Sequence, residues 1–123
     1  MNDPPPTTLD ELRRRGEAAR RISARAVMAD PAAYRELRRM AAAVVADPLD
    51  IGAYHATADA MMRLLERLCR AGAGTYFTYY HRAVDPRGEG DVRTFRALCR
   101  DMLATFAEFD HWRVTQRGLR RVK

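Results

Sequence analysis

The stretch DVRTFRALCRDMLATFAEFDHWRV, residues 91–114, decides the fold. Its large apolar residues recur at alternating steps of three and four, the spacing of one face of a helix that packs in a bundle. The stripe consists of Val92, Phe95, Cys99, Met102, Phe106 and Phe109, and Leu98 and Leu103 broaden it. Nothing here or elsewhere in the chain alternates with a period of two, so no strand is expected.

Four further helices are predicted upstream, and each has a recognisable start or end. Thr8 and Glu11 fit a capping box, in which each side chain caps a backbone N–H at the start of the first helix. Asp-Pro pairs at 30–31 and 47–48 mark new starts, because a capping Asp followed by Pro suits the first helical turn. The expected bounds are about 9–29, 31–46, 50–70 and 75–84.

These patterns predict an all-α protein, a single four- to five-helix bundle with a basic C-terminal tail. The 123 residues suit one domain. Residues 1–8 are expected to form a flexible N-terminal arm, 9–114 the helical bundle, and 115–123 the basic tail. The proline-rich N-terminus does not resemble a signal peptide, and no apolar run approaches about 18 residues. We therefore expect a cytoplasmic protein that does not enter a membrane.

The chain offers little for catalysis or metal binding. Glu108 and His111 form one Glu-x-x-His step, whereas a di-iron bundle needs two such pairs and two more glutamates. Ser23, the only serine, has no His near it in the sequence. Cys69 and Cys99 lie on apolar helical stripes, which indicates buried, reduced thiols. We expect no enzymatic activity, no metal, no cofactor and no disulfide.

The charge of the chain indicates an anionic partner. The net charge is +6, and 21 of the 22 basic residues are Arg, whose planar guanidinium suits phosphate and carboxylate. Arginines with an acid three or four residues away are expected to form ordinary ion pairs within one helix. The candidates for nucleic-acid contact either have no such acid or belong to the acid-free segment from residue 113 onward. They are Arg25, Arg35, Arg38, Arg67, Arg96, Arg100, Arg113, Arg117, Arg120, Arg121 and Lys123.

The helix at 91–114 also resembles the C-terminal helix of the small helical subunit of multi-subunit CRISPR effector complexes, in its type III versions. The residues that carry the resemblance are Phe95, Cys99, Arg100, Met102, Ala104, Phe106, Ala107, Phe109 and Trp112. The resemblance implies a short, basic, all-α subunit that lines up along the effector and binds guide RNA or target strand without catalysis. The basic tail past Trp112 departs from that pattern.

Two functions fit these observations. The first is a non-catalytic accessory subunit of a nucleoprotein assembly. It would bind the backbone of RNA or single-stranded DNA through arginines and contact other subunits, copies of itself included, through apolar and aromatic residues. The alternative is a protein–protein adaptor, such as a phage or plasmid packaging component or a toxin–antitoxin partner. One side of the aromatic cluster at 76–81 is expected to pack in the core, and the other side to pack against a partner or, as the alternative, to stack on bases. A continuous face of locally unpaired arginines would favour the first function.

Overall fold

The protein is described by a computed structural model that covers residues 9–14, 16–47, 51–71, 76–84 and 92–122. Within these ranges the chain is all-α and contains no strand, so the predicted fold class is confirmed. The helices are α1 (Leu9–Arg14), α2 (Gly16–Ala29), α3 (Pro31–Ala46), α4 (Ile51–Ala71), α5 (Tyr76–Ala83) and α6 (Val92–Val122). The predicted flexible arm at 1–8 and Lys123 lie outside the described residues.

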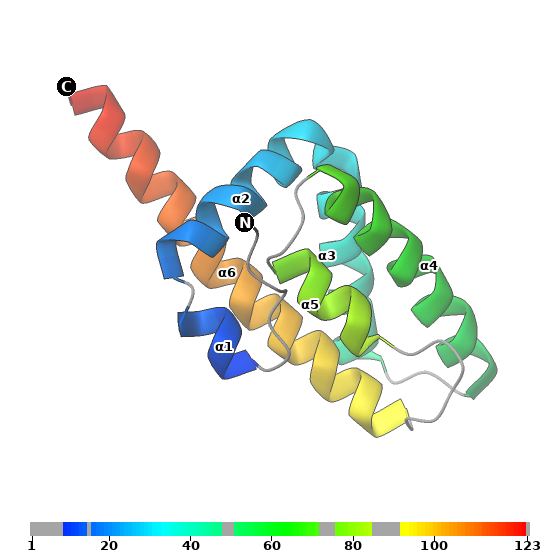
Figure 1. Ribbon diagram of the computed structural model, residues 1–123. Helices are drawn as coiled ribbons and strands as arrows, with labels where there is room; N and C mark the ends of the chain where they lie inside the picture. Colours follow the sequence, from blue (N-terminus) through cyan, green and yellow to red (C-terminus); the bar gives the residue numbers. More distant parts are fainter. Residues whose placement is uncertain (1–8, 15, 48–50, 72–75, 85–91, 123) are drawn as a thin grey trace.

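The long helix α6 lies along one side of the bundle, and α3 packs against both α6 and α4 (Figure 1). Helices α3 and α6 run antiparallel. Tyr34 near the start of α3 contacts Asp110 late in α6, and Val45 at the end of α3 contacts Arg96 early in α6. Helix α5 packs mainly on α4. The apolar faces of α3, α4, α5 and α6 therefore share one interior.

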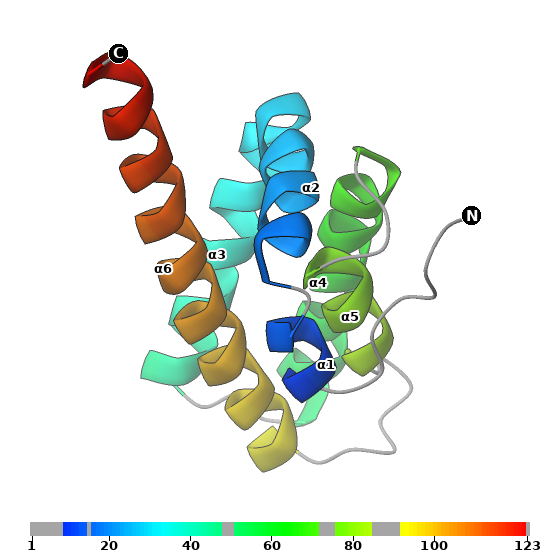
Figure 2. The same ribbon diagram turned by 60° about the vertical axis from the view of Figure 1, so that its left-hand side comes forward.

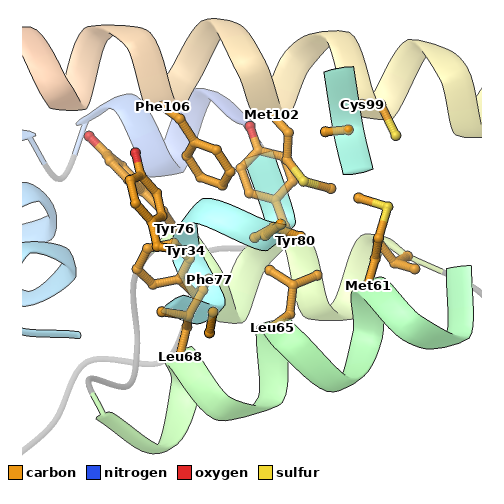
Figure 3. Close-up of a cluster of buried hydrophobic side chains, with 14 of the residues drawn as sticks. Tyr34, Met61, Leu65, Leu68, Tyr76, Phe77, Tyr80, Cys99, Met102 and Phe106 are labelled. Atoms are coloured by element: carbon orange, nitrogen blue, oxygen red, sulfur yellow. The ribbon is translucent and has the colours of Figure 1, made fainter. Parts of the chain in front are cut away.

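The predicted apolar stripes form this interior, as the close-up in Figure 3 shows. The ring of Tyr34 lies near its centre, with ring centroids 6.0 Å from Phe77 and 5.4 Å from Phe106 in edge-to-face arrangements. The side chains of the predicted stripes on three helices are buried: Tyr34, Leu37, Ala41, Val44, Tyr54, Ala58, Met61, Leu65, Leu68, Phe95, Cys99, Met102, Phe106 and Phe109. The periodicity therefore assigned the inward face correctly wherever the side chains are described.

Both cysteines are free thiols on packed helix faces. Cys99 is fully buried, and burial raises the pKa of its thiol to about 12. Cys69 is half-buried, and burial also raises its pKa, while Thr78 donates a hydrogen bond to its sulfur at 3.5 Å. Both thiols therefore remain protonated at neutral pH, which makes them poor nucleophiles.

Helix α3 starts as predicted. The backbone N–H of Ala33 donates to the Asp30 carboxylate at 3.2 Å, and Pro31 occupies the first turn. The same carboxylate accepts two hydrogen bonds from Arg67, at 2.9 Å from Nε and 2.8 Å from Nη2. Asp30 thus caps α3 and also ties α4 to the corner between α2 and α3.

We expect the variant Asp30→Asn to be less stable than the wild type near neutral pH. Asn keeps the cap but loses the charge that Arg67 pairs with. The hydrogen bond from Arg67 holds the Asp30 pKa below its ordinary value of 3.8 in the folded state. A lowered folded-state pKa contributes stability above the unfolded-state value, and that contribution disappears as pH falls through the folded-state pKa. Urea unfolding from about pH 7 to about pH 3 should show that the difference in free energy of unfolding between the wild type and the variant becomes smaller as the pH falls.

The control for this prediction is Asp59→Asn. Asp59 pairs with Arg63 within one helix at 3.1 Å, and both side chains are more than half exposed. Such a pair contributes little to stability, so its loss should leave the urea midpoint almost unchanged at every pH. A deficit in Asp30→Asn that does not vary with pH would contradict the ion-pair explanation.

Two predictions about helix bounds were wrong. The helix expected over 9–29 is interrupted, because Gly16 adopts a φ of +54°, which only a residue without Cβ tolerates easily. The last helix, expected to end near residue 114, continues to Val122. Its C-terminal end projects beyond the other helices (Figures 1 and 2). The predicted basic tail is therefore helical up to Val122, and it extends the bundle as a protruding basic helix.

Candidate nucleic-acid interface

Two of the predicted arginines bind other helices inside the bundle. Arg67 forms the bidentate pair with Asp30 described above. Arg96 donates from Nε and Nη2 to the carbonyl oxygen of Val45, at 3.0 and 2.6 Å, and so binds the C-terminal end of α3. The Arg67 guanidinium neutralises the charge of an acid, and the Arg96 guanidinium binds a carbonyl oxygen at the end of a helix. They stabilise the fold and are not available as they stand for an external phosphate.

Arg38 and Arg113 converge on Asp110. Arg38 forms an ion pair with this carboxylate, Arg113 Nη1 lies 3.7 Å from it, and the Tyr34 hydroxyl donates to it at 2.9 Å. Each guanidinium also lies over a ring, Arg38 over Tyr34 at 5.6 Å and Arg113 over Phe109 at 5.5 Å. Burial raises the pKa of Tyr34 to about 12, so its hydroxyl stays protonated and donates to Asp110.

Three of the predicted arginines are exposed and make no hydrogen bond or ion pair within the described part of the chain. They are Arg25 on α2, Arg35 on α3 and Arg100 on α6. Of these three, Arg25 lines a concave part of the described surface together with other arginines. Because Arg67 and Arg96 are bound to groups of other helices, the candidate interface built on this surface does not include them.

This concave surface lies between the C-terminal half of α2 and α6, and we call it the α2–α6 hollow. It has a volume of about 270 Å³. Its lining comprises Arg21, Ala24, Arg25, Met28, Trp112, Arg113 and Gln116. Three arginines therefore line the hollow together with apolar side chains, and no acid is among the described residues of the lining. Glu17, which pairs with Arg21 at 2.5 Å, is exposed and lies outside the hollow.

A second, more open hollow adjoins the first, and Trp112 lines both. Its other lining residues are Arg20, Ala107, Glu108, His111 and Thr115. The Arg20 guanidinium lies 5.9 Å from the centre of the indole, and its buried Nε has no hydrogen-bond partner among the described residues. Glu108 and His111 face this hollow, but the described residues contain no cluster of three potential metal ligands. The Glu108 carboxylate makes this second hollow less attractive to an anion than the α2–α6 hollow.

Helix α6 continues the positive charge outward from the α2–α6 hollow. Asp110 is the last acid of the chain. Residues 113, 117, 120 and 121 follow at spacings that place them on one side of an α-helix, and all four are Arg. The side chains of Arg117, Arg120 and Arg121 lie outside the described residues, as does Lys123. The helical backbone nevertheless sets an order along α6: Trp112, Arg113 and Gln116 of the hollow come first, and the end of the helix, which protrudes in Figure 2, follows.

Several residues of this surface are not among those predicted from the sequence. Arg21 has an acid, Glu17, four positions before it, which indicates an ordinary intrahelical pair, yet Arg21 lines the hollow. Met28, Trp112 and Gln116 carried no local signal for binding. The Met28 side chain is 74% exposed, which indicates a contact surface, but this exposure is known only after the helices are placed in the fold.

A search against protein-family models, curated proteins and solved structures found no match. The resemblance to the CRISPR effector subunit therefore stays a prediction. Among the described helices, none combines the length and apolar character that a bilayer span requires.

Proposed function

We propose that the protein is a non-catalytic accessory subunit of a nucleoprotein assembly that binds the phosphate backbone of RNA or DNA. Its binding surface would consist of the α2–α6 hollow and the protruding end of α6. A strand would contact the hollow and continue along the basic helix. Other subunits of the assembly would contact the remaining surface.

One observation carries this proposal: three arginines of two different helices line a single hollow, and no acid is among the described residues of its lining. Phosphates bound there would pair with these arginines and release bound counterions. The acid-free segment after Asp110 lengthens the same positive surface. Exposed pairs such as Arg21–Glu17 are weak enough for a phosphate to displace the carboxylate.

A protein–protein adaptor has one observation in its favour. Met28 and Val114 are large apolar side chains that remain 74% and 67% exposed, which is typical of a contact surface for another protein. The strong positive charge around Met28 nevertheless requires an anionic partner, and an ordinary apolar interface is depleted of charge at its centre. The following experiment distinguishes the two functions.

We expect binding of a single-stranded oligonucleotide to weaken steeply with salt, and the double variant Arg21→Ala/Arg25→Ala to flatten that dependence. If each arginine contacts one phosphate, the slope of log K against log salt should fall by about 1.4, or about 0.7 per contact. The triple variant Arg117→Ala/Arg120→Ala/Arg121→Ala should flatten it by about two units. Fluorescence anisotropy of a labelled oligonucleotide over a salt series measures both slopes.

The matched control is Arg63→Ala/Arg82→Ala. Arg63 pairs within its helix as Arg21 does, and Arg82 is exposed without a described partner, as Arg25 is. The control removes the same charge from α4 and α5, away from the hollow, and should leave the slope nearly unchanged. Equal losses in the two double variants, or an affinity that salt does not alter, would reject the proposed surface and favour the adaptor.

A further inference from the structure

We propose that the α2–α6 hollow is a nucleotide subsite for a single strand, in which one unpaired base packs against Trp112 while flanking phosphates bind Arg21, Arg25 and Arg113. This inference rests on the proposed function, because it specifies what part of the strand enters the hollow. It adds a contact to the base itself, which backbone binding does not require.

Trp112 is the only tryptophan of the chain and is only half-buried. Its indole stacks on Phe109, with ring centroids 6.3 Å apart and an interplanar angle of 20°. Phe109 is itself fully buried and packs against Tyr34 and Tyr76. The indole is therefore supported by Phe109, the Arg20 guanidinium lies over the ring 5.9 Å from its centre, and part of the Trp112 surface lines two hollows. A supported aromatic ring at the edge of a positive groove is the usual platform for an unpaired base.

Charge selects which of the two hollows takes the base. The second hollow contains the Glu108 carboxylate, which repels the phosphates on either side of a base. The described lining of the α2–α6 hollow includes three arginines and no acid. Arg21 and Arg25 are on α2 and Arg113 is on α6, so phosphates on both sides of a base in the hollow have a guanidinium to bind.

The other lining residues also suit a base. Ala24 and Met28 of α2 provide apolar surface across from Trp112, and the Met sulfur packs favourably against aromatic rings. The Gln116 amide carries both donors and an acceptor, so it can hydrogen-bond the edge of any base. This combination predicts recognition that tolerates many sequences but requires a base.

Size restricts the occupant. A volume of about 270 Å³ lies below the range of about 300–1,000 Å³ that is typical of small-molecule pockets. It admits one planar ring system and excludes a duplex, whose bases are stacked inside and cannot reach the indole. An acidic peptide could pair with the same arginines, and it is tested below as a competing occupant.

The only tryptophan makes the test direct, because selectively excited tryptophan fluorescence reports on the two adjoining hollows that Trp112 lines. The full chain is titrated with three probes of equal length: a single-stranded oligothymidylate, a duplex, and an abasic strand with phosphates but no bases. We expect the oligothymidylate to quench the fluorescence and to bind about tenfold more tightly than the abasic strand. The abasic strand and the duplex should bind by charge and leave the fluorescence nearly unchanged.

Two variants complete the test, with binding followed by anisotropy of the labelled probe. Trp112→Ala should lose about tenfold in affinity for oligothymidylate and none for the abasic strand. Trp112→Phe should keep most of the affinity, since it retains an aromatic ring. This variant also serves as a control for a loss of folding in the Ala variant. Val114→Ala, an exposed position on the same helix, should match the wild type.

The outcomes separate this inference from the proposed function. Equal, salt-sensitive binding of all three probes without quenching would overturn the base subsite and leave backbone binding intact. No binding of any probe would overturn both. Polyglutamate that quenches Trp112 and competes as well as oligothymidylate would overturn the subsite in favour of an acidic protein partner.

Discussion

Replacing Phe106 with Ala is expected to lower the free energy of unfolding by about 3–5 kcal/mol. The Phe106 side chain is fully buried between α3, α5 and α6 (Figure 3). Its ring centroid lies 5.4 Å from Tyr34 and 5.8 Å from both Phe77 and Tyr80. The substitution removes these aromatic contacts and leaves a cavity, because the three neighbouring rings, one on α3 and two on α5, cannot all move inward. Urea unfolding followed by circular dichroism measures the loss.

The size of this effect is a large part of a typical domain stability of about 5–15 kcal/mol. The control is Val114→Ala on the same helix, where the side chain is 67% exposed. It should change the free energy of unfolding by no more than about 0.5 kcal/mol. A loss of free energy of unfolding below about 1 kcal/mol for Phe106→Ala would contradict the burial of this side chain between α6, α3 and α5.

Replacing Asp110 with Ala is expected to lower the free energy of unfolding by about 1–3 kcal/mol. This carboxylate accepts the hydrogen bond of the Tyr34 hydroxyl and pairs with Arg38 and Arg113. Its removal leaves the buried hydroxyl without its acceptor and two guanidiniums without their acid. The cost stays below that of a fully buried pair, because the side chains of Asp110 and Arg38 are 29% and 35% exposed and water partly replaces the contacts.

Asp110→Ala should also raise the affinity for single-stranded nucleic acid at low salt. The substitution removes a negative charge beside the α2–α6 hollow, together with the ion pair between Asp110 and Arg113, which lines the hollow. Stability and affinity should thus change in opposite directions, which a merely misfolded variant would not show. Asp59→Ala is the control, since its pair with Arg63 is exposed and its loss should cost no more than about 0.5 kcal/mol. Parallel losses of stability and affinity in Asp110→Ala would contradict this assignment.

The sequence determined the helices and their inward faces because both depend on short-range spacing. Steps of three and four identified buried positions on α3, α4 and α6, and the Asp30–Pro31 pair located the start of α3. The break at Gly16 and the continuation of α6 past residue 114 were overlooked. A glycine is compatible with a helix or a break, and only the packing of the neighbouring segments selects one.

Only the tertiary structure decided which arginines remain available. A local rule compares residues within one helical turn, so it counted Arg38, Arg67 and Arg96 as unpaired. Their partners come from other helices: Asp110, Asp30 and the Val45 carbonyl. The same rule set Arg21 aside because of Glu17, although Arg21 lines the hollow. A guanidinium on a long side chain pairs with whatever acceptor folding brings within reach, and that acceptor is often far away in the sequence.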